Sequence, residues 1–268
     1  MKKVGYEQAM EIAHKMSTKF IYDMAQLEGN TATYEEVETI AAGRSVGGLS
    51  VREVNQVYGI AKGWNRMLDF LKDGNFEVSK EVAVLLNMNI SSGENYNGFG
   101  DFRVRPVRIS GTDYMPPRPD ELETLWNEMI DGIEKAPDDE KALYLYLESS
   151  RNQYFGDGNK RTALTMMNAM LIEEGYCPIT ITMEDNKEYR SKLLDFYERY
   201  DPASRKSLYE FLKKCQDKVY EYWVVEPERK AQQEKEREKE ISTAKTKTAP
   251  KKIQLKVYKP KTNKGMSR

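Results

Sequence analysis

Apolar residues recur at helical spacing through most of this chain, and no other feature of the sequence restricts the fold as strongly. In the segments 120–134, 138–150 and 161–174, the apolar side chains fall on one stripe of a helix. Thr33 and Glu36 have the spacing of a capping box at the start of another helix. Similar spacing predicts further helices at 6–27, 33–42, 50–71, 79–88, 188–200 and 207–224. Apolar residues make up 39% of the 268 residues, enough for a core, so the pattern predicts an all-α protein.

One region interrupts the helical pattern. Residues 91–119 are rich in Gly, Asn, Ser and Pro, which suits loops. Within them, an alternation typical of a β-strand begins at Phe102 and ends at Ile109. Because Pro106 has no N–H to donate, this segment suits an edge strand or a bulge. We expect a short β-hairpin that protrudes from the helical body.

Charge divides the chain into an acidic body and a basic tail. Up to residue 240 there are 33 basic and 43 acidic residues, a net charge of −10, whereas nine basic and no acidic residues follow. The run 232–240 suits a fraying helix, and the Lys/Thr/Pro-rich residues from Ser242 onward suit disorder. We therefore expect three parts: N-terminal helices at 1–90, a core at 91–225, and a charged tail, largely disordered, at 226–268.

The sequence pattern suggests neither a secretion signal nor a membrane span. No apolar stretch follows the first residues, and no run approaches 18 apolar residues. The two cysteines, Cys177 and Cys215, are too few for a disulfide framework and fit a reducing compartment. We expect a cytoplasmic protein that has no membrane partner.

The most informative stretch begins at Gln153 and reads Gln-Tyr-Phe-Gly-Asp-Gly-Asn-Lys-Arg, between two predicted helices. Its two glycines allow tight turns and the close approach of a ligand. The helix that follows directs backbone N–H groups and the positive end of its dipole at the turn. Lys160 and Arg161 add positive charge, and Asp157 offers the kind of oxygen ligand that magnesium prefers. Together these features predict a site for the phosphates of a nucleotide.

Two other ligand-binding loops do not fit this stretch. The spacing of a Walker loop, Gly-x4-Gly-Lys-Ser/Thr, is absent. Arg161 stands where a calcium loop needs a third oxygen ligand. On composition alone, an ordinary charged turn between two helices remains an alternative.

The stretch resembles the signature of the Fic/Doc family, whose Fic-fold members are protein adenylyltransferases. The family pattern is His-x-Phe-x-Asp/Glu-Gly-Asn-Gly/Lys-Arg, and residues 155 and 157–161 match it in register. Two further segments are similar to family features: residues 102–109 with the following Pro116-Pro117 to the target-docking flap, and Leu27-Glu28-Gly29-Asn30-Thr31 to the inhibitory-helix motif. The resemblance spans roughly residues 20–181 and implies a Fic-fold helical bundle with a short β-hairpin flap.

The resemblance also implies roles for the matched residues. Asp157 would hold Mg²⁺, and Phe155 would anchor the loop in the core. An unknown target or partner protein would dock along the flap by β-strand addition, and Glu28 would be a regulatory carboxylate. The phosphates of ATP would be bound by four consecutive residues, Gly158, Asn159 (through its side chain as well), Lys160 and Arg161.

Gln153 occupies the position of the family's catalytic base, which is a histidine. A base must accept a proton from the attacking hydroxyl group, and a glutamine amide cannot do this. The only histidine in the chain, His14, belongs to a predicted N-terminal helix and suits a packed or surface position. Because general base catalysis typically contributes about 10²–10⁴-fold, we expect transfer by the usual route to be weak or absent.

Three further positions depart from the family or resemble only one branch of it. Lys160 stands where AMP-transferring members usually have glycine, and it is similar to the Doc branch, which the family associates with phosphate transfer. Leu164 stands where many members have a second arginine that meets the inhibitory glutamate. Met24 stands where the inhibitory motif usually has Ser or Thr. Glu28 therefore has two interpretations, an inhibitory carboxylate or an ordinary carboxylate at a helix end.

Three functional hypotheses follow. The first is an enzyme that transfers AMP or phosphate from ATP to a protein hydroxyl, with Gln153 in place of the base. The second is a non-catalytic module that uses the same fold to bind a nucleotide or a protein. The third is nucleic-acid binding through the basic tail 245–268, with some support from a loose helix-turn-helix pattern at 50–67. The acidic body disfavours this third hypothesis.

Overall fold

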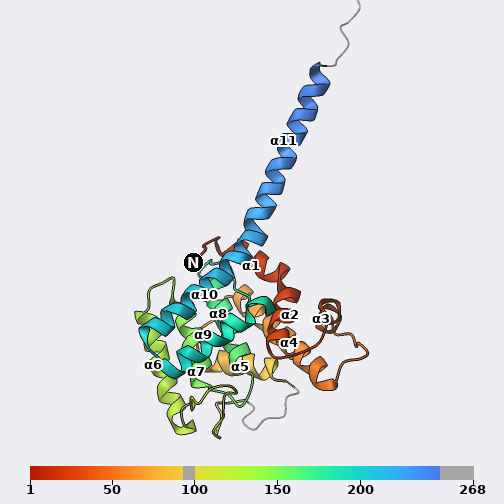
Figure 1. The fold of residues 1–268 in the computed structure, drawn as a ribbon. Coiled ribbons are helices and arrows are strands. Elements are labelled where there is room, and N and C mark those ends of the chain that lie inside the picture. The colour runs from red at the N-terminus through yellow and green to blue at the C-terminus, as the bar shows by residue number, and fades with distance from the viewer. Residues whose placement is uncertain (93–99, 248–268) are drawn as a thin grey trace, which may run out of the picture. The chain divides into compact units, whose positions relative to one another are not determined.

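The computed structural model of the chain describes residues 1–92 and 100–247, with side chains up to residue 238. The chain divides into two compact units, Met1–Val224 and Val225–Arg268. The first unit is built of helices joined by loops (Figure 1), so the predicted all-α fold is confirmed. Its helices are α1 (Tyr6–Lys15), α2 (Ser17–Leu27), α3 (Tyr34–Ala41), α4 (Val51–Lys72), α5 (Lys80–Ile90), α6 (Leu122–Lys135), α7 (Lys141–Asn152), α8 (Asn159–Glu173), α9 (Asn186–Arg199) and α10 (Pro202–Tyr220). Short turns precede α6 (η1, Pro119–Glu121) and α9 (η2, Met183–Asp185), and a π-helical turn follows α10 (η3, Glu221–Val225).

The predicted capping box at the start of α3 is present. The backbone N–H of Glu36 donates to Thr33 Oγ1 at 3.2 Å, and the backbone N–H of Thr33 donates to the Glu36 carboxylate at 2.8 Å. Ser50 and Glu53 form the same pair at the start of α4. Each box satisfies two N–H groups that the helix leaves unbonded at its beginning.

The single helix that we predicted at 6–27 is two helices, because the chain breaks between α1 and α2 at Met16. The Ser17 hydroxyl donates to the carbonyl oxygen of Ala13 at 3.0 Å and accepts the indole N–H of Trp64 at 2.9 Å. Side-chain bonds of this kind to the preceding turn compete with helical bonding and bend helices. The break therefore has a cause that needs neither glycine nor proline.

Helix α8 lies inside the first unit and supports the predicted phosphate loop. It packs against α7, α4, α5 and α1 (Figure 1), and almost all of its residues are buried. A helix that is covered on every side needs no polar face. The loop thus precedes the first turn of a helix whose position is fixed by packing.

The expected β-hairpin is not present at residues 102–109, which we call the flap. No strand is assigned in the described residues, and their isolated β-bridge joins Lys3 to Tyr176. The flap is held by a side chain instead. The Arg103 guanidinium donates to the carbonyl oxygens of Gln153 at 2.6 Å, Arg105 at 3.0 Å and Pro117 at 2.5 Å. A strand ladder also needs main-chain N–H groups, and the proline within the flap has none.

The second unit contains α11 (Glu226–Lys247). We predicted disorder from Ser242, but the helix continues for five residues beyond it. The Glu, Lys, Arg and Gln residues that dominate this segment are strong helix formers, and Lys230 lies 4.0 Å from the Glu226 carboxylate one turn away. Residues 248–268, with most of the predicted basic tail, lie outside the described residues, as do residues 93–99 of the predicted loop region.

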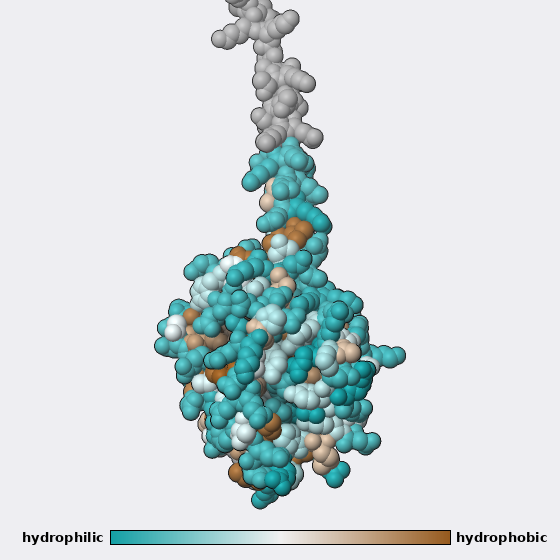
Figure 2. Space-filling model, turned by 90° about the vertical axis from the view of Figure 1, so that its left-hand side faces the viewer, coloured by the Kyte–Doolittle hydropathy of each residue, from teal (hydrophilic) through white to brown (hydrophobic). Residues whose placement is uncertain are grey.

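The surface of the first unit reflects the high content of charged residues. The face shown in Figure 2 is mostly hydrophilic, with small and separate hydrophobic patches. Charged residues make up 32% of the chain, which is above the usual quarter. Among the described residues, no helix has the length and apolar character needed to cross a membrane.

Candidate functional site

The predicted phosphate loop joins α7 to α8 and is closed by one side chain. Asn159 Oδ1 accepts the backbone N–H of Phe155 at 2.7 Å, and Asn159 Nδ2 donates to the carbonyl oxygen of Phe155 at 2.8 Å. Phe155 is buried, with its ring centre 5.7 Å from that of Phe102. The resemblance implied a bond from the Asn159 side chain to phosphate, whereas in the structure both ends of this amide hold the loop.

Gly158 is required for two independent reasons. Its φ of +72° lies in the left-handed region that side chains disfavour. A Cβ atom at this position would lie 2.2 Å from Ser91 Oγ and 3.1 Å from Asn87 Nδ2. The same Asn87 Nδ2 donates to the carbonyl oxygen of Asp157 at 2.9 Å. Helix α5 therefore presses directly on the loop, and only glycine leaves the space that this contact needs.

Positive charge gathers where α8 begins. The first turn of a helix carries N–H groups without intrahelical acceptors and the positive end of the dipole. The Arg161 side chain in this turn is only 3% exposed, and its guanidinium donates to Asp157 Oδ1 at 3.1 Å. Lys160 adds a second cation from the same turn. Backbone and side chains together suit an anionic ligand.

Glu28, at the end of α2, reaches this positive region. Its carboxylate lies 3.0 Å from the Lys160 ammonium group. Burial acts to raise the pKa of Glu28, but the positive charges of Lys160 and Arg161 outweigh it, and the pKa is lowered. Burial acts to lower the pKa of Lys160, but the Glu28 charge outweighs it, and the pKa is raised. Both groups are therefore charged at neutral pH and form an ion pair beside the loop.

These groups line a cavity of about 270 Å³, which we call the loop cavity. Its walls come from segments that are far apart in the sequence, namely the end of α2, the flap and the loop. Its lining comprises Glu28, Val107, Arg108, Gln153 and residues 156–161. All of the site residues that the sequence predicted therefore line one cavity.

Residues 77–171 match the Fic/DOC family. The chain contains a Fic/DOC family domain. Two curated relatives are named protein adenylyltransferase Fic. The one from Nematostella vectensis is 24% identical over 216 residues, which are 76% of this chain and 48% of the relative. The one from Drosophila willistoni is 26% identical over 211 residues, which are 76% of this chain and 41% of the relative. The chain thus spans less than half the length of these relatives.

Solved structures share the Fic fold. A Fic domain containing signaling protein from Bacteroides thetaiotaomicron has a TM-score of 0.67 at 20% identity, over 82% of this chain and 88% of that chain. Fic-1 from C. elegans has a TM-score of 0.69 at 16% identity, over 84% of this chain and 73% of that chain. At these identities the likeness establishes the fold alone, and the predicted Fic-fold helical bundle is confirmed.

Gln153 of the Fic/DOC domain lies at the end of α7 in a left-handed conformation, with φ 53° and ψ 60°. Its side-chain Nε2 donates to the carbonyl oxygen of Ser150 at 2.6 Å. His14 is exposed on α1 and does not belong to the lining of the loop cavity. The glutamine that replaces the expected base therefore faces the cavity, and the only histidine of the chain does not.

Asp157 fits a magnesium ion that arrives together with phosphates. Its side chain is 49% exposed, and its Oδ1 also accepts the backbone N–H of Gly158 at 2.6 Å. No group of three or more His, Cys, Asp or Glu residues that would hold a metal occurs in the described part of the chain. Mg²⁺ is commonly bound by one or two carboxylates plus phosphate oxygens and water, so the single carboxylate of this loop is a donor of the kind that Mg²⁺ uses.

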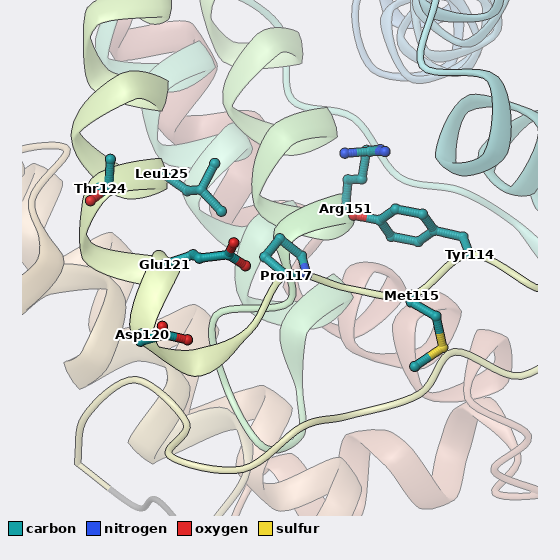
Figure 3. Close-up of a pocket in the computed structure, with 8 residues that line it drawn as sticks. All are labelled: Tyr114, Met115, Pro117, Asp120, Glu121, Thr124, Leu125 and Arg151. Carbon is teal, nitrogen blue, oxygen red and sulfur yellow. The ribbon is translucent and has the colours of Figure 1, made fainter.

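A second cavity of about 510 Å³ lies where the chain leaves the flap (Figure 3). Its lining includes Tyr114, Met115 and Pro117 on one side, Leu125 of α6 on the other, and Arg151 near the end of α7. The Arg151 guanidinium lies 4.2 Å from the centre of the Tyr114 ring. Arg151, which lines this cavity, precedes Gln153 by two residues in the sequence.

Two site residues were missed by sequence reasoning. Arg103 is 2% exposed and joins the flap to the loop through the bonds described above. Asn87, on the buried face of α5, bonds the carbonyl oxygen of Asp157 and lies 3.0 Å from Thr162 Oγ1. The only signal for Asn87 was a polar residue on an otherwise apolar helix face, and Arg103 gave no signal that distinguishes it from an exposed arginine.

Proposed function

We propose that the Fic/DOC domain binds ATP with Mg²⁺ through the phosphates, in the loop cavity, and that it transfers AMP or phosphate to a protein hydroxyl only slowly. The observation that carries this proposal is the convergence of the α8 N-terminus, Lys160 and Arg161 on one cavity. The relatives described above are named protein adenylyltransferase Fic, which supports a nucleotide as the ligand.

The charges at the loop give each residue a role in this proposal. Phosphate oxygens accept hydrogen bonds from the first turn of α8 and from the two cations that follow Asn159. Asp157 holds Mg²⁺, which neutralises phosphate charge when it is bound. The Coulomb attraction between an anion and a cation grows with the number of charges that meet. Glu28 supplies one such interaction to Lys160, whereas a triphosphate brings several charges, so the nucleotide displaces Glu28.

Gln153 limits the chemistry that we propose. Its amide can position a hydroxyl group or a phosphate by hydrogen bonding, but it cannot accept the proton of an attacking hydroxyl. A non-catalytic module that binds a nucleotide or a protein is the second candidate function, and the same residue favours it. The two candidates differ in turnover, and they agree on phosphate binding if the module binds a nucleotide.

A target protein would meet the domain at the flap. Val104 is largely exposed near the start of the flap, and the cavity of Figure 3 opens where the chain leaves it. Tyr114, Met115 and Leu125 offer apolar surface there for a side chain of the target. The flap is a loop without strand pairing of its own. A target strand that bonds the main chain of the flap would therefore form the first pair of β-strands there.

Isothermal titration calorimetry of the full chain with ATP and Mg²⁺ tests the proposed binding. We expect one saturable site, competition by tripolyphosphate, and little competition by adenosine, because the phosphates supply most of the contacts. Asp157→Asn is expected to reduce the dependence on Mg²⁺, while Asp131→Asn, at an exposed position of α6, changes nothing. A protein that fails to bind ATP with Mg²⁺, or a site for which adenosine competes as well as tripolyphosphate, contradicts the proposal.

Removing the negative charge of Glu28 is expected to strengthen ATP binding. In Glu28→Gln the phosphates no longer compete with a carboxylate for Lys160, so we expect a dissociation constant about tenfold lower, equivalent to about 1.4 kcal/mol. The measurement is the same titration, with the exposed Glu38→Gln of α3 as a matched control. An affinity that is unchanged or weaker in Glu28→Gln would show that Glu28 is an ordinary helix-end carboxylate.

A further inference from the structure

A cavity of about 590 Å³ lies apart from the loop cavity, and the proposed function does not use it. It is formed by the junction of α1 and α2, the segment after α8 and the end of α10, and it shares no lining residue with the loop cavity. We call it the aromatic cavity, after Tyr34, Tyr222 and Trp223 in its walls. Its volume lies within the range of about 300–1,000 Å³ that is usual for small-molecule sites.

The aromatic walls are unusually exposed. Tyr222 is 60% exposed and Tyr34 is 40% exposed, although both rings are large and apolar. Tyr222 and Trp223 meet edge to face, with ring centres 5.1 Å apart. Both belong to the π-helical turn η3, and such turns are rare and occur frequently at functional sites. Rings held in this way offer a flat apolar surface to a ligand.

Three ammonium groups accompany the rings, from Lys15, Lys19 and Lys218. Lys15 lies 2.6 Å from the Glu11 carboxylate, and Lys218 lies 2.6 Å from Asp185 Oδ1. Lys19 pairs with a carboxylate of its own helix α2. None of the three partner carboxylates lines the cavity. The three lysines therefore line the cavity, whereas the acidic residues that pair with them lie outside its lining.

This arrangement selects the charge of a ligand as well as its shape. An ammonium group has three donors, so a lysine with one carboxylate partner can still bond an anion. Because each lysine is already paired, the cluster suits a singly charged group better than a polyphosphate. The cavity also lacks the glycine-containing loop that helps to make the loop cavity suitable for phosphates.

We propose that the aromatic cavity binds a planar aromatic molecule with one negative charge, such as an aromatic carboxylate or sulfonate. The ring system lies against Tyr34, Tyr222 and Trp223, and the acidic group bonds the lysine ammonium groups. This site is independent of the nucleotide site proposed above.

Titration of the full chain with 1-anilinonaphthalene-8-sulfonate, followed by fluorescence, tests this proposal. We expect one saturable site. Tyr222→Ala is expected to weaken binding about tenfold, and Lys15→Gln about threefold, because each removes one kind of contact. Matched controls come from the exposed residues Tyr58 and Lys62 on α4, which lie outside the cavity. The Lys62 ammonium group lies 5.6 Å from the centre of the Tyr58 ring. Tyr58→Ala and Lys62→Gln are expected to leave the binding unchanged.

Three further measurements separate this site from alternatives. The neutral probe N-phenyl-1-naphthylamine is expected to bind more weakly than the sulfonate, and equal binding would overturn the role of the lysines. Saturating ATP with Mg²⁺ is expected to leave sulfonate binding unchanged, and competition would assign the probe to the loop cavity. Equal unfolding midpoints of the variants exclude a loss of folding. Non-saturable binding, or an equal effect of Tyr58→Ala and Tyr222→Ala, would also overturn the proposal.

Discussion

Gln153→His is expected to raise the rate of label transfer from ATP to protein by about 10²–10⁴-fold, the usual contribution of a general base. The imidazole has a pKa near neutrality and can accept the proton that a glutamine amide cannot. The backbone supports the change, because Gln153 is left-handed at φ 53° and histidine is enriched in that region. The assay follows α- and γ-labelled ATP in a cell lysate, so the label that appears on protein identifies which phosphate moves.

A matched control for this change is Gln153→Asn, since asparagine also tolerates a left-handed backbone and is not a base. We expect it to transfer as slowly as the wild type. In Gln153→His combined with His14→Gln, the gain is expected to persist, because His14 is exposed on α1 and does not line the loop cavity. If Gln153→His binds ATP as well as the wild type does and still gains no transfer, the loss of a base is not what limits this domain.

The helical part of the fold could be predicted because its causes are local. The capping box of Thr33 and Glu36 lies within four residues, and each helix carries its own apolar spacing. The break at Met16 could not be predicted, since it depends on the indole of Trp64, which is 47 residues from Ser17 in sequence. Contacts of this kind leave no periodic pattern.

The loop could be predicted for a similar reason. Its glycines, cations and carboxylate are contiguous in the sequence, and a predicted helix follows them directly. The contact of Glu28 with Lys160 joins residues 132 positions apart, and only the resemblance to the Fic/Doc family suggested that the two segments meet. The two bonds of the Asn159 amide could not be predicted, because the sequence does not show that Phe155 presents both of its backbone groups to it.

The flap is where the sequence pattern was misleading. A strand would bury alternate residues, but Phe102 and Arg103 are neighbours and both are buried. The alternation of arginine with valine and proline resembled a strand because arginine was taken as exposed, as it usually is. Arg103 is buried because its guanidinium reaches three carbonyl oxygens, and two of these, from Gln153 and Pro117, lie outside the flap.

Arg103→Met is therefore expected to reduce the free energy of unfolding by about 2–4 kcal/mol. Hydrogen bonds from a charged donor contribute about 1.5–3 kcal/mol each, and relief of the buried charge offsets part of their loss. Burial lowers the pKa of Arg103, which reflects the cost of keeping this cation away from water. Arg103→Lys is expected to recover only part of the loss, because an ammonium group cannot reproduce the planar fork of donors that reaches three carbonyl oxygens.

Urea denaturation measures this change, with Arg105→Met as the matched control, since Arg105 lies in the same flap and is exposed. We expect the control to change the free energy of unfolding by less than about 0.5 kcal/mol.

Because Arg103 bonds the backbone of Gln153 as well as Pro117, the folded Arg103→Met variant is also expected to bind ATP with Mg²⁺ more weakly than the control does. Equal stability of the two variants would mean that the guanidinium bonds merely offset the cost of burying the charge. Lost stability with unchanged ATP affinity would mean that Arg103 supports the fold and does not position the loop.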